Sequence, residues 1–367
     1  MKFIGVFLSV WSVCIASVAQ EGPTRFAEPI AILRHFEEMP RALTLPDGRL
    51  IALFISHDGP GVPAAKDDQQ VRARYSTDNG DSWSQESVLF TLPKEAGGFG
   101  YWVGMVDREG EIHLFMLNDR ESGAILPLPE GKKGPAITIH TPLDIWHVRS
   151  TDNRTEWEAP KRIWAGRAGD LQSVIQLRSG RIVLPFSYLT DRTWSNRGSG
   201  QERFTYYGQF NCGVLYSDDA GGTWAVSVDT LKTPAVDLSA YGPIEPVVVE
   251  RNDGRVWMLI RTQMGRFYES FSADGSRWSH PKPSALLSSD APAGLLRLQN
   301  GELLLLLNSC QRFPYGNGGR HVLHAAISND DGETWGGFRE VLRDPQQAYG
   351  PPPTGDNGVS YPYLTLA

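Results

Sequence analysis

Short apolar segments alternate with tight turns along most of the chain. The turns share a polar residue followed by glycine and are Asp47-Gly48, Glu109-Gly110, Ser179-Gly180, Asp253-Gly254 and Asn300-Gly301. Runs such as "VIQL" before a turn and "IVLPF" after it are apolar at successive positions, which predicts strands buried on both faces. Glycine accepts the positive φ that a two-residue hairpin turn demands. The pattern therefore predicts five β-hairpins.

A second motif follows each hairpin and contains Ser, Asp, Gly and Trp at fixed offsets. Its copies are "YSTDNGDSW" at 75–83, "STDNRTEW" at 150–157, "YSDDAGGTW" ending at Trp224, "SADGSRW" at 272–278 and "SNDDGETW" at 328–335. The second copy lacks the Gly, and the fourth is one residue shorter. The Asp can accept hydrogen bonds from the backbone of its own turn, and the Trp can pack between neighbouring sheets. We therefore assign a structural role to Asp78, Asp218 and Asp330 and do not count them as catalytic acids.

The two motifs together define a repeated four-stranded unit. Each unit runs as strand, tight turn, strand, variable loop, strand, Asp-containing turn and strand. The Ser residues of the second motif lie at positions 76, 150, 217, 272 and 328, so the units recur at intervals of 55 to 74 residues. Four-stranded meanders repeated at such a period predict an all-β protein with β-propeller architecture.

Composition narrows the classes of partner. The chain has 367 residues, 38 of them Gly and 25 Pro, which fits many turns. Its formal net charge of −7 argues against a general nucleic-acid binder, because such binding needs a surplus of Lys and Arg facing phosphates. An anionic ligand must therefore meet a local cluster of cations.

The N-terminus has the pattern of a secretory signal peptide. Lys2 precedes an apolar run from Phe3 to Ala16, and small residues stand at Ser17 and Ala19. We expect residues 1–19 to be cleaved and the mature protein to be secreted or periplasmic. The run is short for a membrane span, and no other segment approaches the required length. Cys212 and Cys310 would remain, either as one disulfide or as two buried thiols.

The repeats resemble the Asp-box (BNR) repeats of the sialidase superfamily, whose fold is a six-bladed propeller. The resemblance covers essentially the whole mature chain, and we expect the propeller domain to span residues 26–367. The final segment "YLTLA" at 363–367 parallels "ALTLP" at 42–46, where a hairpin turn follows. We therefore expect the sixth unit to be incomplete in this sequence, as in a C-terminally truncated protein.

Three segments carry the functional part of the resemblance. Glu245 precedes an apolar strand and Arg261 follows the next turn, sixteen residues after the Glu (261 − 245), as in the corresponding sialidase segment. Arg320 lies eight residues before the Asp-box Ser328 (328 − 320), and "SYPYL" places Tyr361 at the position of the sialidase nucleophile. The repeat pattern places Glu245 and Tyr361 at the start of inner strands. Arg261 ends a second strand and Arg320 begins a third strand on the same side of the propeller, where ligands of propellers bind.

This resemblance implies an exo-α-sialidase that works without a cofactor or metal. Sialic acid carries a carboxylate on its anomeric carbon, and guanidinium groups can bind it with two hydrogen bonds. Because an anionic nucleophile would be repelled by the sialic acid carboxylate, sialidases use Tyr as nucleophile in a retaining mechanism. A neighbouring Glu can take the phenol proton. The implied partners are sialylated or other acidic glycans.

The first unit departs from the sialidase pattern, which has Arg-Ile-Pro at the entry of its first strand. This chain has Met39 at the aligned Arg, so Arg34 or Arg41 would supply the first cation, with Arg34 preferred. The acid/base Asp would come from the loop after "LIALF", where Asp67 is preferred over Asp58 and Asp68. Two other functions remain open: a hydrolase or lyase for another acidic sugar, such as a uronic acid, and a non-catalytic glycan-binding propeller.

Overall fold

The structure of the chain is a computed structural model. It describes residues 4–8, 13–16, 31–33, 40–55, 69–92, 98–119, 124–126, 137–139, 143–189, 210–234, 242–308, 320, 322–343 and 359–366. All regular elements within these ranges are β-strands. The described part of the chain contains no helix long and apolar enough to cross a membrane.

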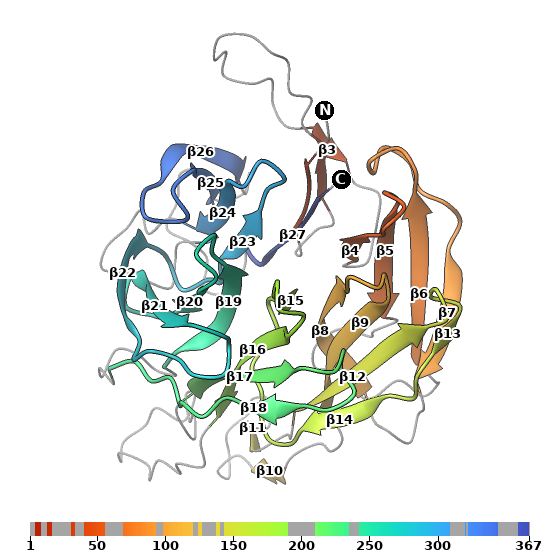
Figure 1. The fold of residues 1–367 in the computed structure, drawn as a ribbon, viewed down its shortest axis with the longest axis horizontal. Coiled ribbons are helices and arrows are strands. Elements are labelled where there is room, and N and C mark those ends of the chain that lie inside the picture. Colours follow the sequence, from red (N-terminus) through yellow and green to blue (C-terminus); the bar gives the residue numbers. More distant parts are fainter. Residues whose placement is uncertain are drawn as a thin grey trace, which may run out of the picture.

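The strands form blades arranged around a central axis, which confirms the predicted propeller (Figure 1). Blade 1 consists of β4 (Arg41–Thr44), β5 (Leu50–Ile55), β6 (Gln69–Ser76) and β7 (Ser87–Leu92). Blade 2 consists of β8 (Gly98–Val106), β9 (Ile112–Asp119), β12 (Leu143–Thr151), β13 (Glu156–Trp157) and β14 (Lys161–Trp164). Between β9 and β12 lies a separate hairpin of β10 (Ala124–Leu126) and β11 (Ile137–Ile139).

The next three blades each have four antiparallel strands in sequence order. Blade 3 consists of β15 (Ile175–Gln176), β16 (Ile182–Leu189), β17 (Phe210–Ser217) and β18 (Ala225–Val226). Blade 4 consists of β19 (Ile244–Glu250), β20 (Val256–Arg261), β21 (Arg266–Ser272) and β22 (Lys282–Leu287). Blade 5 consists of β23 (Gly294–Arg297), β24 (Leu303–Asn308), β25 (Val322–Ser328) and β26 (Gly336–Arg343).

The sixth sheet combines the two ends of the sequence. Its inner strand is β27 (Pro362–Leu366), which pairs with β1 (Ile4–Leu8), followed by β2 (Val13–Ala16) and β3 (Ala31–Leu33). β27 also lies against β4 and β23, so it stands between blades 1 and 5. The end of the sequence thus contributes one strand to the sixth blade, as predicted. Two other strands of this sheet, β1 and β2, belong to the segment predicted to be a signal peptide.

The five hairpin turns are tight, but their loops contain three residues rather than the predicted two. In the first, Leu45 N donates to Arg49 O at 2.8 Å and Gly48 N donates to Leu45 O at 2.9 Å. Gly48 has φ of 85°, and the glycines of the other four turns have φ between 86° and 94°. This is a type I turn followed by a left-handed residue, which needs glycine because a side chain is strained there.

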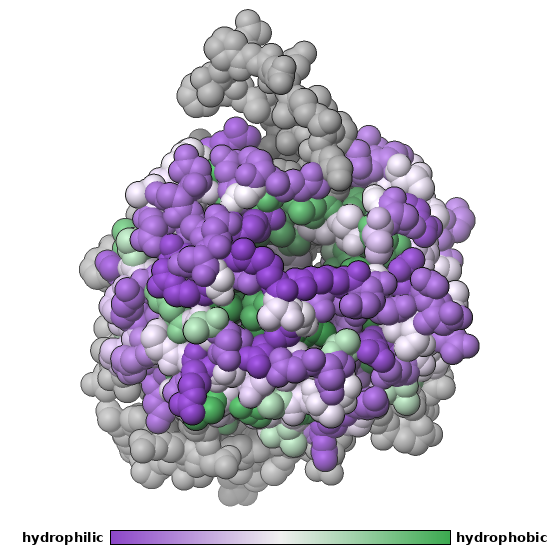
Figure 2. Space-filling model, viewed as in Figure 1, coloured by the Kyte–Doolittle hydropathy of each residue, from purple (hydrophilic) through white to green (hydrophobic). Residues whose placement is uncertain are grey.

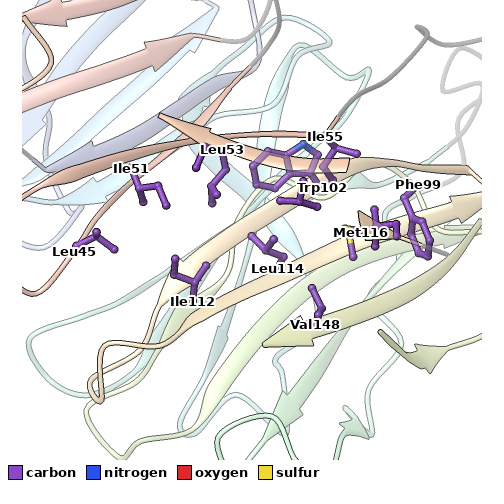
Figure 3. Packing of buried hydrophobic residues seen from close by; sticks show 13 residues of the cluster. Leu45, Ile51, Leu53, Ile55, Phe99, Trp102, Ile112, Leu114, Met116 and Val148 are labelled. Atoms are coloured by element: carbon purple, nitrogen blue, oxygen red, sulfur yellow. The ribbon is translucent and has the colours of Figure 1, made fainter. Parts of the chain in front are cut away.

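The apolar core lies between adjacent blades. Each blade packs its apolar face against the next, so the core is divided into five clusters, each at one blade boundary. The cluster between blades 1 and 2 contains Leu53 of β5, Trp102 of β8 and Met116 of β9 (Figure 3). The second strands β20 and β24 each lie between two such clusters, which explains why they are buried at every residue, and β5 is fully buried as well. The prediction of strands buried on both faces is confirmed for them.

The Asp-containing turns are hydrogen-bonded as the sequence predicts. In the first, Asp78 Oδ1 accepts from Ser76 Oγ at 2.7 Å and from Ser82 N at 2.9 Å. The hydrogen bond from the Ser82 hydroxyl, with the other donors of the turn, lowers the pKa of Asp78 to about 2. Trp83 Nε1 donates to Gly80 O at 3.0 Å and fixes the indole over the turn. Asp330 makes the same contacts in blade 5.

One of these assignments was wrong by a single residue. In blade 3 the carboxylate within the turn is Asp219, whose Oδ1 accepts from Ser217 Oγ at 2.8 Å and from Thr223 N at 2.8 Å. Asp218 instead points outward and forms an exposed ion pair with Arg181 at 2.7 Å. The structural position is the second residue after the Ser in blades 1, 3 and 5, which the doubled Asp of this copy obscured.

The Trp residues of the motif connect neighbouring blades, as predicted. Trp224 of blade 3 lies edge-on to Phe115 of blade 2, with ring centroids 5.3 Å apart. Trp157 of blade 2 lies 4.6 Å from Phe90 of blade 1. The turn therefore holds each Trp against the preceding blade and stabilises both the blade and the ring of blades.

The face in view in Figure 2 is mostly hydrophilic, with hydrophobic residues gathered in the depression near its centre. The inner strands surround this centre (Figure 1). Side chains at the ends of these strands are therefore the ones that the fold brings together.

Candidate active site

Irregular backbone conformations set the direction of the side chains of two predicted site residues. The pairing of β19 with β20 shifts its register between Ile244 and Val247, and Glu245 within this bulge has φ of 51°. Tyr361, just before β27, has φ of 58°. Left-handed conformations at such residues cost about 1–3 kcal/mol each and are typical of functional sites. Both side chains thus leave the regular alternation of their strands.

Tyr361, Glu245 and Arg261 form one hydrogen-bonded group. Tyr361 Oη donates to Glu245 Oε1 at 3.2 Å, and Arg261 Nη1 donates to Tyr361 Oη at 3.0 Å. Arg261 Nη1 also donates to Glu245 Oε2, so the guanidinium bridges the phenol and the carboxylate. Glu245 and Arg261 are each 5% exposed, whereas Tyr361 is partly exposed. The structure therefore brings together three residues predicted from widely separated segments.

Arg320 joins this group through Asp290, a residue that the sequence analysis missed. Arg320 Nη2 donates to the backbone carbonyl of Asp290 at 2.8 Å, and Arg261 Nε donates to the Asp290 carboxylate at 2.7 Å. The guanidinium of Arg320 lies 5.4 Å from the centre of the Tyr361 ring. The carboxylates of Glu245 and Asp290 balance the charges of the two arginines. Asp290 precedes β23 as Glu245 opens β19, so its position relative to the hairpin turn could have revealed it.

The phenol of Tyr361 is protonated in this setting. Burial raises the pKa of Tyr361 well above its usual range, and the charge of Glu245 raises it further. Arg261 and Arg320 act in the opposite direction but do not compensate. A reaction in which the Tyr361 oxygen forms a bond therefore needs a base for its proton, and Glu245 Oε1 is the hydrogen-bonded acceptor.

A second polar group lies beside the first at the start of blade 3. Gln172 Nε2 donates to Asp170 Oδ2 at 3.0 Å. Burial raises the pKa of Asp170 to about 7; the charge of Glu245 also raises it, whereas Arg41 lowers it. Asp170 is partly exposed as a residue, but its Oδ1 is shielded from water and has no hydrogen-bond partner. The same is true of Gln172 Oε1 and of Arg41 Nη1.

Tyr363 connects these residues across the axis. Its phenol donates to Leu171 O in blade 3 at 3.1 Å, although Tyr363 belongs to β27 of blade 6. The guanidinium of Arg41, at the start of β4, lies over the Tyr363 ring, and Arg41 Nε donates to Trp102 O at 3.2 Å. Tyr363 thus fills the centre of the propeller between the opposing blades 3 and 6.

Several predicted residues lie outside the described part of the chain. These are Arg34, the three acid/base candidates Asp58, Asp67 and Asp68, and Cys310. Their proposed roles stay predictions. Arg41, the alternative to Arg34, is described and is 8% exposed. Cys212 in β17 is a free, buried thiol, as in the second of the two alternatives for the cysteines, and Cys310 lies outside the described residues.

Comparison with known families agrees with this architecture. The family model described as "BNR repeat-like domain" matches residues 48–367, which is most of the chain. This protein belongs to the BNR repeat-like domain family. The expected BNR repeats and the expected β-propeller fold are thereby confirmed. No curated protein matches this BNR repeat-like chain by sequence.

Solved structures similar to this BNR repeat-like protein include sialidases at low sequence identity. The NanB sialidase from Streptococcus pneumoniae is 14% identical with a TM-score of 0.56, over 87% of this chain and 64% of NanB. The intramolecular trans-sialidase from Ruminococcus gnavus is 14% identical with a TM-score of 0.55, over 82% and 84% of the two chains. A Dyadobacter fermentans protein of unknown function is 18% identical with a TM-score of 0.57, over 83% and 82%. These similarities establish the shared fold.

Proposed function

We propose that this protein is a secreted exo-α-sialidase that releases terminal sialic acid from glycans through a retaining, Tyr-linked intermediate. The observation that carries the proposal is the hydrogen-bonded group of Tyr361, Glu245 and Arg261. It contains a nucleophile, a base for its proton and a cation for the substrate carboxylate. Sialidase-type hydrolysis uses Tyr because an anionic nucleophile would be repelled by that carboxylate.

In the first half of the reaction, Tyr361 Oη attacks the anomeric carbon and the bond from that carbon to the leaving oxygen breaks. The phenol proton passes to Glu245 Oε1, which is 3.2 Å away in the free protein. The leaving oxygen takes a proton from an acid, for which Asp67 is the preferred candidate. Water then attacks the same carbon and gives a proton to the carboxylate left when the acid lost its proton. The Tyr361 oxygen leaves and takes back its proton from Glu245. Two inversions give overall retention.

The substrate carboxylate would bind on the arginine side of the site. Arg261 forms ion pairs with both Glu245 and Asp290, whereas Arg41 has no ion-pair partner among the described residues. The buried Nη1 of Arg41 has no hydrogen-bond partner. We assign Arg41 as the cation that adds net positive charge for an anionic sugar, with Arg261 and Arg320 beside it.

We also propose that residues 1–19 form a cleaved leader. Cleavage near Ala19 would remove β1 and β2 from the sixth sheet and expose the backbone edge of β27. N-terminal sequencing of protein recovered from the medium or periplasm should start close to Gln20. Recovery of the active protein with Met1 in place would contradict the leader.

The deciding experiment measures the turnover of a fluorogenic α-sialoside and of a matched β-glucuronide. A separate assay for 4,5-unsaturated products detects elimination from the uronate. We expect hydrolysis of the sialoside, with nuclear magnetic resonance showing the α-anomer of sialic acid formed first. Hydrolysis or elimination confined to the uronate would favour the acidic-sugar alternative. Binding of both sugars without turnover of either would favour the non-catalytic propeller.

A further inference from the structure

Two buried hydrogen-bond acceptors beside the Tyr361 group are unused. Asp170 Oδ1 and Gln172 Oε1 are both shielded from water and lack a hydrogen-bond partner within the described part of the chain. Gln172 is only 6% exposed, and its Nε2 is held by Asp170 Oδ2. Folded proteins pair nearly all buried polar atoms, because an unpaired one has lost its hydrogen bonds to water without gaining a partner. Two unpaired acceptors on adjoining side chains therefore point to a ligand that supplies the donors.

The backbone of this segment is fixed against the strand that carries Glu245. Gly169 N donates to Ser187 O at 2.8 Å, and Glu245 N donates to Ser187 Oγ at 3.3 Å. A Cβ on Gly169 would lie 2.3 Å from Ser187 Oγ and 3.3 Å from Ile244, so only glycine permits this approach. Asp170 follows Gly169 directly and thus adjoins the Glu245 bulge.

The other side of the segment is fixed by Tyr363. Leu171, between the two side chains, accepts the hydrogen bond from the Tyr363 phenol at 3.1 Å. The guanidinium of Arg41 covers the opposite part of the same tyrosine. The acceptors of Asp170 and Gln172 therefore share the axial region with the arginines, but they have the opposite hydrogen-bonding character.

We propose that Asp170 and Gln172 form a subsite that accepts hydrogen bonds from the hydroxyl or amide N–H groups of the bound sugar. The proposal rests on the proposed function of the same site and adds how the sugar is oriented and selected. A carboxylate has no donor and is repelled by these acceptors, so it faces the arginines while the donor groups of the sugar face blade 3. Such a subsite selects polyhydroxylated acids over plain carboxylic acids, because a ligand without donors leaves both acceptors unpaired.

Gln172→Met tests the subsite with little change in side-chain volume. Binding of N-acetylneuraminic acid, glucuronic acid and cyclohexanecarboxylate to the full chain is measured by calorimetry. Loss of one such hydrogen bond should weaken the binding of at least one of the two sugars by about 5- to 100-fold. The affinity for cyclohexanecarboxylate, which has the carboxylate but no donors, should change by less than about twofold.

Asp170→Asn provides an independent variant. Its amide oxygen can accept from Gln172 Nε2 in place of Asp170 Oδ2, and its amide nitrogen then presents a donor at the position of the Asp170 Oδ1 acceptor. The same loss for the sugar is expected. The matched control is Gln176→Met in β15, because Gln176 already accepts from Arg108 N at 2.9 Å and donates to Gly180 O at 3.1 Å. It should alter the melting temperature but no ligand affinity.

The outcomes separate the subsite from the proposed function. If Gln172→Met and Asp170→Asn leave both sugars unchanged, or if the parent binds cyclohexanecarboxylate as tightly as the sugars, the acceptors hold a buried water only and the subsite is wrong. Arg261→Lys should weaken all three ligands. If Arg261→Lys weakens the binding of none of them while Gln172→Met still weakens the binding of a sugar, the subsite stands and the assignment of Arg261 to the carboxylate fails. If the parent binds none of the three, both fail.

Discussion

The Tyr361 phenol donates a hydrogen bond to the Glu245 carboxylate at 3.2 Å, although 116 residues separate them in the sequence. Tyr361 precedes the inner strand of blade 6 and Glu245 opens the inner strand of blade 4. Both have a left-handed backbone conformation, which turns their side chains toward each other. The contact depends on the closed ring of blades, because no local segment could bring the two residues together.

Tyr361→Phe should abolish most turnover while preserving the fold. The ring still fills its place between Arg261 and Arg320, but the oxygen that would attack the anomeric carbon is gone. We expect kcat on a sialoside to fall by at least about 100-fold, with Glu245→Gln falling similarly because the phenol loses its base. Steady-state kinetics on the purified variants measure both.

Tyr268→Phe is the control for the loss of one buried hydroxyl. The Tyr268 phenol is 3.8 Å from Met264 Sδ in blade 4 and does not touch Tyr361, Glu245 or Arg261 among the described contacts. Its kcat should stay within about twofold of the parent. Full turnover by Tyr361→Phe in an otherwise active protein would exclude the Tyr-linked mechanism.

Arg261 should show a sharp difference between two substitutions. Arg261→Lys keeps one positive charge between Glu245 and Asp290, so we expect a folded protein whose KM rises because the two-pronged contact is lost. Arg261→Met leaves two buried carboxylates without their cation, which should cost about 3–5 kcal/mol of unfolding free energy. Denaturant melts check the second value, and equal stability of both variants would contradict the electrostatic role.

The adjacent residues Asp218 and Asp219 offer a matched pair for stability. Asp219→Ala removes the acceptor for Ser217 Oγ, Thr223 N and Thr223 Oγ1, so we expect a loss of about 1–3 kcal/mol. Asp218→Ala removes only an exposed ion pair with Arg181 and should change stability by less than about 1 kcal/mol. Urea unfolding of both variants decides, and the reverse order would refute the assignment of Asp219.

A buried histidine pair should make stability depend on acid. His113 Nδ1 and His147 Nε2 are 3.0 Å apart, and His113 Nε2 lies 3.0 Å from Asp107 Oδ2. Burial between Phe115 and Trp224, together with the smaller effect of the His113 charge, lowers the pKa of His147 to about 3. The folded state therefore binds this proton less well than the unfolded chain. Stability should fall as pH decreases from about 6.5 toward 3.

His147→Phe tests this dependence, because phenylalanine retains the stacking but cannot be protonated. It should lower stability at pH 7, where it leaves His113 Nδ1 unpaired, but reduce the further loss between pH 6 and pH 4. Exposed His280 is the control, and His280→Phe should leave the pH profile of thermal melting unchanged. An unaltered slope in His147→Phe would show that other groups cause the acid sensitivity.

The sequence by itself determined the blades. Apolar runs, glycine turns and the Ser-Asp-Gly-Trp motif are local signals, since each arises from backbone dihedrals or hydrogen bonds within about ten residues. They sufficed for the strands of five blades and for the structural role of Asp78 and Asp330. The doubled Asp of blade 3 led to the wrong choice of Asp218, although the offset of two residues from the Ser, which holds for Asp78 and Asp330, identifies Asp219.

Only the tertiary structure decided which side chains share the axis. Spacing placed Glu245, Arg261, Arg320 and Tyr361 near strand ends, but their contacts require bulges and the closure of the ring. Asp170, Gln172 and Asp290 carry no motif, and their importance appears from burial and hydrogen bonding alone. Burial and long-range pairing depend on strands from opposite blades meeting at one axis, and a linear pattern contains no such distances.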